Sequence, residues 1–431
     1  MRSLVPLFSL VLVLFGSSSL LLAQTCPGCL DPNFGGGSIV RVPDVSTATI
    51  RDLVRQSSDG KMIALVPGHN IADGQRITRI NPDGTVDTAF GSEGTLTFQW
   101  KVVQRNNTYY GSVLGLGVQN VGGTEHVLIA GDSPMLSGNK VIAKRLRVER
   151  LMLNGSPDPS WGTNGTLLLN LDGAVTLTVD PVDQSIVVGT GNTNQLIRLT
   201  AAGQLDTSFG SGGVANSTYP VRLHIDAQRR ILVAGWVTNR NGTLSTPTVT
   251  RHKPDGKLDT SFGSNGTARV GFNLGTAYVS VSTDSFNHVI FSNSTGTSDT
   301  TDFGVERFTD SGIPDPTFSG DGIATIDFNG QRDLAMASAP QSDGSIVIVG
   351  NTAVVGTGNG SDIAVARLDY YGNLDVTFGI GGRIVFPHTP GGESMSTILM
   401  VTDPNWTGER FYAAGINSQA NQLLVARFLE F

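Results

Sequence analysis

A sixteen-residue segment recurs six times along the chain, and this internal repeat constrains the fold more strongly than any other feature. One copy, at residues 251–266, reads RHKPDGKLDTSFGSNG. The other copies occupy residues 79–94, 150–165, 198–213, 307–322 and 367–382. A residue type that returns at a fixed offset in every copy meets the same local need each time, whereas a catalytic group is needed once. The repeated positions are therefore interpreted as structural.

Each copy begins with an arginine, followed by four landmarks at constant spacing. A glycine lies five residues after the arginine: Gly84, Gly155, Gly203, Gly256, Gly312 and Gly372. An aspartate lies eight residues after it: Asp87, Asp158, Asp206, Asp259, Asp315 and Asp375. An aromatic residue lies eleven residues after it: Phe90, Trp161, Phe209, Phe262, Phe318 and Phe378. A second glycine follows at fifteen residues.

Two partial copies lie at the ends of the chain. The segment LDPNFGGG, which starts at Leu30, contains the aspartate and aromatic positions as Asp31 and Phe34 but has no arginine strand. The segment VARFLEF, which ends at Phe431, has the arginine strand but no aspartate or aromatic residue. The two ends together complete a seventh copy.

The segments between the landmarks predict four β-strands per repeat. Short apolar runs such as TLLLNL, alternating runs such as AVTLTVD and β-branched runs such as DQSIVVG precede the arginine strand, and turn residues separate them. No segment shows a sustained helical period. Seven four-stranded units predict an all-β fold, a closed seven-bladed β-propeller. If the aspartate–aromatic segment is a hairpin within a blade, the first and last strands share a blade; if it links blades, seven whole blades run in series.

The repeat resembles that of the delta-60 repeat family, secreted or surface bacterial proteins whose units are similar to ARxxPDGxLDxxFGxxG. The resemblance covers residues 30–431, with departures at Trp161, at Ser319 and at two prolines in the leucine position. It implies a propeller fold and an extracellular location, and it implies no catalytic residue.

The repeated residues have roles that local chemistry predicts. The first glycine is expected at a hairpin turn with positive φ. The aspartate is expected to accept N–H bonds from the residues after it, and the aromatic ring to fill apolar space between blades. The arginine is expected to pair with that aspartate or with a neighbouring carbonyl. We predict no catalytic, cofactor-binding or metal-binding residue in this chain and no cofactor; in the repeated loops Asp83, the nearest candidate calcium ligand, is replaced in most other copies.

The N-terminal sequence predicts export. Residues 1–23 combine Arg2 with a short apolar run and are interpreted as a signal peptide, which leaves residues 24–431 as a single propeller domain with no membrane span. A local disulfide between Cys26 and Cys29 is expected in an exported chain. The predicted localisation is secreted: extracellular, on the cell surface or in the periplasm.

Charge and composition restrict the partners. The formal net charge of −7 is diffuse and argues against nucleic acid as a ligand. We expect a monomeric binding or structural module whose ligand, a carbohydrate or a protein, contacts the variable loops 131–145, 236–250 and 351–362. The basic stretch 139–150 is interpreted as a solvated strand or loop in preference to a site for an anionic partner. Candidate exposed aromatic residues, which would suit stacking on a sugar ring or peptide if they cluster on one face and are ordinary packing residues if they are scattered, are Trp100, Tyr109, Tyr110, Trp236, Tyr371 and Trp406.

An enzyme is the alternative reading. A polysaccharide lyase, or a hydrolase such as a lactonase, would need acids, histidines or tyrosines converging at one mouth of the channel. The Gly131-Asp132-Ser133 block resembles the nucleophile motif of GDSL esterases, but no matching Asp-x-x-His follows it. The six histidines fall in different repeats, and none forms a paired metal-ligand spacing.

The structural reading of the repeat predicts the effect of one substitution. Asp259→Ala should lower the melting temperature without changing any ligand affinity, because it removes a local backbone acceptor. Thermal unfolding and a binding measurement on the same preparation test this. Unchanged stability with lost binding would contradict it.

Overall fold

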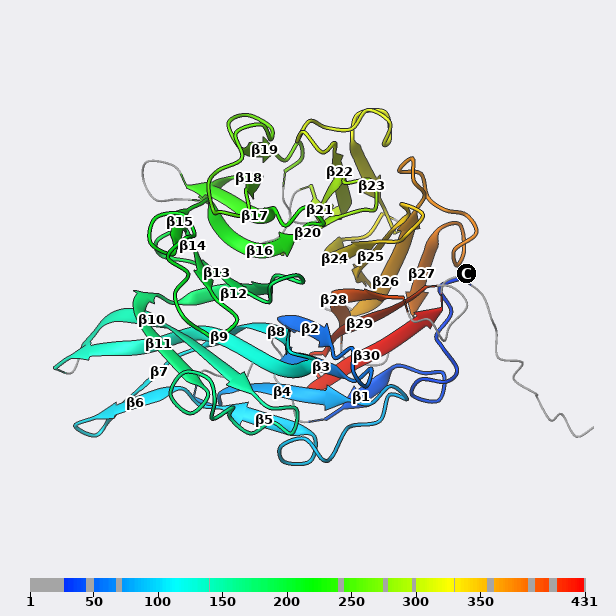
Figure 1. Ribbon diagram of the computed structural model, residues 1–431. Helices are drawn as coiled ribbons and strands as arrows, with labels where there is room; N and C mark the ends of the chain where they lie inside the picture. The colour runs from blue at the N-terminus through cyan, green and yellow to red at the C-terminus, as the bar shows by residue number, and fades with distance from the viewer. Residues whose placement is uncertain are drawn as a thin grey trace, which may run out of the picture.

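The computed structural model describes residues 27–43, 50–66, 72–138, 140–238, 244–273, 278–296, 300–328, 330–354, 360–386, 392–402 and 409–429. Its ordered elements are strands, and they form seven antiparallel four-stranded sheets arranged in a ring (Figure 1). The predicted all-β, seven-bladed propeller is therefore confirmed. The described residues include no helix long and apolar enough to cross a membrane.

The blades are numbered in chain order, and the strands of each are given from the channel outward. Blade 1 contains β2 (Asp52–Arg55), β3 (Met62–Val66), β4 (Gln75–Ile80) and β5 (Thr95–Phe98); blade 2 contains β8 (Val113–Val121), β9 (Thr124–Ser137), β10 (Lys140–Leu151) and β11 (Thr166–Asp172); blade 3 contains β12 (Ala174–Val179), β13 (Ile186–Thr190), β14 (Gln195–Leu199) and β15 (Val214–Asn216); blade 4 contains β16 (Tyr219–Ile225), β17 (Ile231–Thr238), β18 (Leu244–His252) and β19 (Thr267–Arg269).

The remaining blades follow the same order. Blade 5 contains β20 (Ser280–Thr283), β21 (Val289–Thr295), β22 (Asp302–Phe308) and β23 (Ile323–Ile326); blade 6 contains β24 (Asp333–Pro340), β25 (Ile346–Ala353), β26 (Ser361–Leu368) and β27 (Arg383–Phe386); blade 7 contains β28 (Glu393–Val401), β29 (Arg410–Asn417), β30 (Gln422–Leu429) and β1 (Val40–Val42). A separate hairpin, β6 (Lys101–Gln104) and β7 (Asn107–Tyr110), lies between blades 1 and 2 and was not predicted.

The two ends of the chain share blade 7. Strand β1 pairs antiparallel with β30, with Val40 opposite Val425, so the N-terminal strand completes the blade that the C-terminal strands begin. This settles the question that the sequence left open: the aspartate–aromatic segment connects the third and fourth strands within a blade.

The strand directions give the propeller two distinct ends. Within each blade, neighbouring strands run in opposite directions. The connections from one blade to the next and the loops between second and third strands therefore emerge at the same end of the propeller. We call this end the loop face. The first-to-second turns and the repeated segments emerge at the opposite end, which we call the joint face. The variable loops named from the sequence therefore belong to the loop face, apart from residues 139, 239–243 and 355–359, which lie outside the described residues.

The core lies between neighbouring blades. Phe90, for example, packs with Ile63 and Leu65 of blade 1 and with Val127 and Ile129 of blade 2. Six of the seven repeated aromatic residues have no exposed surface, and Trp161 is 1% exposed. Burying a side chain of this size contributes about 2–3 kcal/mol. The repeated aromatic ring is thus a main apolar contact between each pair of blades.

Ring closure depends on Asp31. Its fully buried carboxylate forms 2.9 Å ion pairs with Arg410 and Arg427, which come from the other end of the chain. We expect Asp31→Asn to lower the free energy of unfolding by about 3 kcal/mol, because it leaves two cations at the clasp without a counter-charge. Urea denaturation measures this.

The matched control is Asp206→Asn. Asp206 makes the same repeated contact with Arg198 in the interior of the chain, but its side chain is 20% exposed. This variant should lose about 1 kcal/mol. An equal loss in both variants would show that the clasp has no special place in the stability of the ring.

Candidate functional site at the central channel

The repeated arginine and aspartate form an ion pair in every blade. The pairs are Arg79–Asp87 (2.7 Å), Arg150–Asp158 (2.7 Å), Arg198–Asp206 (2.7 Å), Arg251–Asp259 (2.8 Å), Arg307–Asp315 (2.8 Å), Arg367–Asp375 (2.7 Å) and, across the chain ends, Arg427–Asp31 (2.9 Å). In blade 4, Asp259 also accepts bonds from the N–H and the hydroxyl of Ser261. Burial alone would raise the pKa of the Asp259 carboxyl, but the Ser261 and Arg251 contacts outweigh it and lower the pKa.

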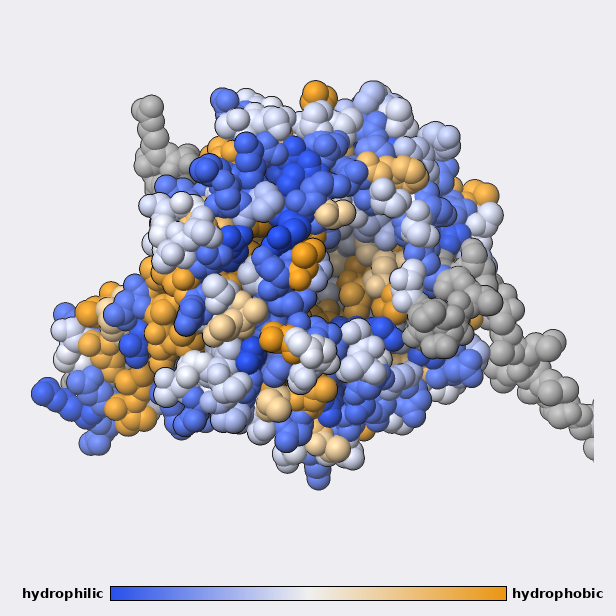
Figure 2. Space-filling model, in the orientation of Figure 1, coloured by the Kyte–Doolittle hydropathy of each residue, from blue (hydrophilic) through white to orange (hydrophobic). Residues whose placement is uncertain are grey.

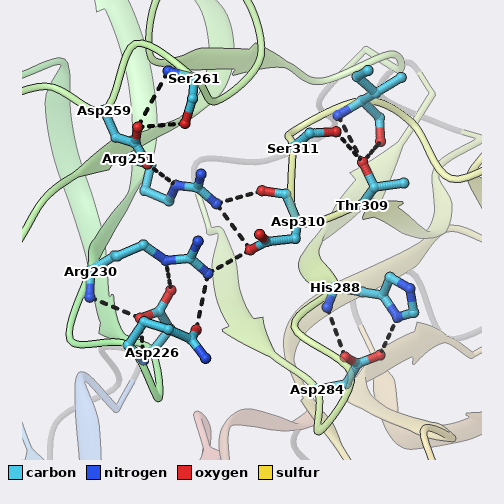
Figure 3. Close-up of polar contacts among 12 residues, drawn as sticks. Asp226, Arg230, Arg251, Asp259, Ser261, Asp284, His288, Thr309, Asp310 and Ser311 are labelled. Atoms are coloured by element: carbon cyan, nitrogen blue, oxygen red, sulfur yellow. Dashed lines mark hydrogen bonds and ion pairs between the residues drawn. The ribbon is translucent and has the colours of Figure 1, made fainter.

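The same arginine also joins its blade to the next one. Arg251 donates from Nη1 to the carbonyl oxygen of Asp310 in blade 5 at 2.5 Å, as Figure 3 shows. Its guanidinium lies 4.6 Å from the ring centre of Phe262. Equivalent carbonyl contacts join Arg307 to Tyr370 at 2.5 Å and Arg427 to Pro82 at 2.7 Å. The repeated residues therefore build a structural joint, and their charged and hydrogen-bonding groups are paired with one another within it.

The first repeated glycine is needed for two reasons. Gly203, Gly256 and Gly312 have φ between 75° and 83°, and a Cβ at each would overlap the aromatic ring of the preceding blade. The first glycines of the other three full copies have φ of 91°, 87° and 83°. Gly28, with φ of 81°, lies against Phe378 in the same way.

Gly28 was missed in the sequence because CPGC was interpreted only as a disulfide segment. The signal was present: Gly28 precedes Asp31 by three residues and Phe34 by six, as in every full copy. The seventh copy therefore begins before Leu30. Cys29 is disulfide-bonded, while Cys26 and the predicted signal peptide, residues 1–23, lie outside the described residues.

Two of the histidines share a structural position that sequence spacing did not reveal. His126 is the third residue of β9, and His288 directly precedes β21; their Nε2 atoms lie 3.4 and 3.8 Å from the repeated aspartates Asp158 and Asp315. His288 also contacts Asp284 at 2.8 Å (Figure 3). His252 is buried within blade 4, and His69 and His388 lie outside the described residues. The described histidines thus do not meet at one site.

Two charged residues that have no charged counterpart in the other blades lie at the channel. Asp52 of β2 and Arg222 of β16 each stand opposite the equivalent residue of the second strand in their own blade. The two residues therefore lie at the same level of the ring. The residues at this level in the other five blades are small and uncharged: Gly115, Thr176, Ser280, Ala337 and Thr397. One acidic residue, Asp52, and one cationic residue, Arg222, therefore share this level with five small residues.

Arg222 spans the channel. Blades 1 and 4 stand on opposite sides of the ring, yet Nη2 of Arg222 donates to the carbonyl oxygen of Arg51 at 2.8 Å. Tyr219 and Tyr278 lie close enough to Arg51 to influence its charge. Surrounding protein and the Arg222 charge lower the pKa of the Arg51 guanidinium, although its surface is open to solvent. Two arginines and two tyrosines thus converge at the loop-face mouth.

The channel environment shifts two further groups. Desolvation raises the pKa of Asp52 to about 6, against the opposing charge of Arg222. Desolvation lowers the pKa of His224 to about 4, and its Nε2 atom lies 2.9 Å from the Thr283 hydroxyl. His224 is therefore neutral at pH 7, and Asp52 titrates near the range used for proton transfer. Sequence could not find these groups, because only ring closure brings their blades together.

Other predicted contact residues are distributed differently. The basic stretch forms β10, which extends with the end of β9 beyond the body of the propeller (Figure 1). Its Val141 and Ile142 are 45% and 58% exposed, and apolar residues gather on this part of the surface in Figure 2. Trp100 is not exposed, contrary to expectation: it is buried beneath Arg147 at 4.7 Å. Tyr371 is exposed, and Trp406 lies outside the described residues.

The Gly-Asp-Ser block lies inside a strand. Gly131 is in β9, where a Cβ would overlap the carbonyl oxygen of Ser112 on the neighbouring strand. Asp132 pairs with Lys144 at 3.0 Å, and Ser133 is buried. The block therefore serves strand packing, and its serine has no histidine among its described contacts.

Four segments of the chain match a family model. The family is described as a domain of unknown function (DUF5122) beta-propeller, and the matched residues are 57–90, 184–209, 229–262 and 341–378. Each match runs from a first-to-second turn or its end to the repeated aromatic residue of blade 1, 3, 4 or 6. A search of curated proteins found no match.

Solved structures match the chain at low sequence identity and with TM-scores below 0.5. A protein of unknown function from Dyadobacter fermentans is 12% identical over 91% of this chain and 99% of that chain, with a TM-score of 0.45. YCF48 from Cyanidioschyzon merolae is 10% identical over 90% and 98%, also with a TM-score of 0.45. A structure described as glucose dehydrogenase is 13% identical over 74% and 96%, with a TM-score of 0.42.

A buried glutamate near the joint predicts a pH dependence of stability. Glu306 accepts the N–H of Gly271 at 2.7 Å, and burial, together with the charge of Asp321, raises its pKa to about 7. Because the folded state holds this proton more tightly than the unfolded state, the contribution of Glu306 to stability falls as pH rises toward and through 7. Glu306→Gln keeps an acceptor for Gly271 and removes the titration.

We therefore expect Glu306→Gln to be more stable than the wild type at pH 8, and this advantage to shrink by about 1 kcal/mol at pH 6.5. Urea denaturation of both proteins at the two pH values measures the difference. A difference that does not change with pH would contradict the assigned titration.

Proposed function

We propose that this propeller is an exported binding module that holds an anionic group of its ligand at the loop-face mouth of the channel. The observation that carries the proposal is the convergence of Arg51 and Arg222, which arrive from opposite sides of the ring. A structural role would be expected in every blade, as at the joint. These two arginines have no counterpart at their level of the other blades.

Arg222 has unused binding capacity. Among the described residues its guanidinium makes one hydrogen bond, to the Arg51 carbonyl, and no ion pair within 4 Å. A guanidinium has five N–H donors in a planar fork that suits a carboxylate, sulfate or phosphate. The adjoining Tyr219 and Tyr278 add ring surface and hydroxyl groups, and Tyr278 is 41% exposed. An acidic saccharide or an acidic peptide end fits this combination.

Figure 2 shows a hollow near the positions that β24 and β28 have in Figure 1. We infer from this hollow that the ring is open to an entering group. Small residues at the level of Arg222 leave room beside the arginine. The fold places the site on a rigid ring, so a ligand would meet side chains that are already positioned.

A second function is favoured by one observation. Asp52, with its pKa of about 6, lies near Arg222 and within the channel, so it is suited to exchange a proton with a bound substrate. This supports the alternative of a propeller enzyme, a lyase or hydrolase acting on polysaccharide or lactone. Asp52→Asn separates the two readings, since binding by the arginines should survive while turnover should stop.

The binding proposal is tested by screening the full-length protein on arrays of acidic and neutral glycans and of peptides. Affinities of the hits are then compared for the wild type and for Arg222→Gln. We expect the hits to be anionic, their affinity to fall as salt is raised, and Arg222→Gln to weaken binding at least tenfold.

The matched control is Arg269→Gln, which removes an exposed arginine from the outermost strand of the same blade. It should bind like the wild type. Binding of neutral ligands only, or equal loss in both variants, would refute a channel site.

Export, a monomeric state and the delta-60 resemblance are part of the same proposal. The apolar run within residues 1–23 supports export, and the repeated arginine, glycine, aspartate and aromatic positions support the resemblance.

A further inference from the structure

We propose that Asp302, Asp327 and Asp333 bind a calcium ion at the seam between blades 5 and 6. This site is separate from the channel arginines and does not rest on the function proposed above. Each carboxylate occurs where a strand begins or ends: Asp302 starts β22, Asp327 follows β23, and Asp333 starts β24. The sequence analysis predicted no metal site from the repeated loops, which lie on the opposite face, or from the spacing of the histidines; these three aspartates follow no such pattern.

The geometry suits a single ion. One oxygen from each carboxylate lies within 4.8 Å of the other two. Two oxygens bound to the same calcium at about 2.4 Å are separated by no more than about 4.8 Å, so small side-chain movements are enough to bring all three into contact with one ion. The cluster has no nitrogen or sulfur donor. An all-oxygen set favours calcium or magnesium over transition metals.

Asp333 provides the independent indication of a ligand. It is 0% exposed, its Oδ1 atom has no hydrogen-bond partner, and its Oδ2 atom accepts the N–H of Phe328 at 2.6 Å. None of the three carboxylates forms an ion pair with a lysine, arginine or histidine among the described residues. A buried carboxylate beside two others is costly unless a cation or a proton neutralises it.

Two buried hydroxyls supply further oxygens near the cluster. Thr352 stands opposite Asp333 in the β24–β25 register, and the carbonyl of Thr301 accepts the N–H of Asp333 at 2.6 Å. Thr301 and Thr352 are 0% and 5% exposed; the Thr301 hydroxyl has no hydrogen-bond partner, and the Thr352 hydroxyl makes no bond of good geometry although it lies close enough to Asp333 to act on that carboxylate. Unsatisfied hydroxyls in such a position can turn toward a cation. With water, these groups approach the six to eight oxygens that calcium takes.

An ion at this place would fasten one blade to the next. Asp302 and Asp327 belong to blade 5, whereas Asp333 and Thr352 belong to blade 6. On the joint face the same two blades are held by the Arg307 contact to Tyr370. Calcium would therefore stabilise the loop-face side of a seam whose other side is already fixed.

The test uses the full-length protein, freed of metal with a chelator, titrated with calcium chloride by calorimetry and followed by thermal unfolding. We expect one binding site with a dissociation constant below about 1 mM, and a melting temperature raised by at least about 3 °C at 10 mM calcium. Magnesium should bind more weakly, because it takes oxygens at about 2.0–2.1 Å in near-ideal octahedral geometry and gives up its own waters reluctantly.

Two variants keep the test independent of folding. Asp327→Asn alters the exposed ligand and should fold normally while binding calcium at least tenfold more weakly. Asp333→Asn should abolish the calcium-dependent rise in melting temperature, yet its metal-free melting temperature should equal or exceed that of the wild type, because a repelling charge is removed.

Asp321→Asn is the matched control, since Asp321 is an exposed acid of the same blade outside the cluster. It should bind calcium like the wild type. The proposal is overturned if the wild type shows no binding at 10 mM calcium, or if Asp327→Asn and Asp333→Asn bind as tightly as the control.

Discussion

The buried ion pair between the repeated arginine and aspartate is the interaction on which the rest of the structure depends. The aspartate fixes the turn that follows it, and this turn places the aromatic ring in the interblade core. The arginine bridges the aspartate, the face of that ring and a carbonyl of the next blade. Buried charges of this kind are stable only when every partner is present. Each blade is therefore held both internally and to its neighbour by one group of residues.

This joint also explains how the ring closes. The chain is interrupted within the joint of blade 7, so the aspartate and the ring come from the N-terminal segment while the arginine comes from the C-terminal strand. In blade 7 the ion pair and the β1–β30 pairing together hold the third and fourth strands side by side. In the other six blades a continuous hairpin has this role. Gly28 completes this arrangement by filling the turn position against Phe378.

A repeated joint on one face leaves the other face free to differ from blade to blade. On the loop face each connection has its own length and composition, and the groups without repeated counterparts collect there or in the channel below. Arg51 and Arg222 on one side, and the aspartates of the blade 5–6 seam on the other, are examples. Both proposed sites combine side chains from different blades, which is the arrangement expected of sites added to a shared scaffold.

The sequence by itself determined the number of blades, the four-stranded unit and the positions of Gly256, Asp259 and Phe262, because a local turn and its nearest contacts are encoded within sixteen residues. It did not determine that Asp52 and Arg222 share one level of the channel, or that Asp302 and Asp333 meet at a seam. Those juxtapositions depend on ring closure and strand register. These bring together residues that are about 170 positions apart in the first case and about 30 in the second, and no local sequence pattern marks either pair. Only the tertiary structure decided where the unrepeated chemistry of this chain gathers.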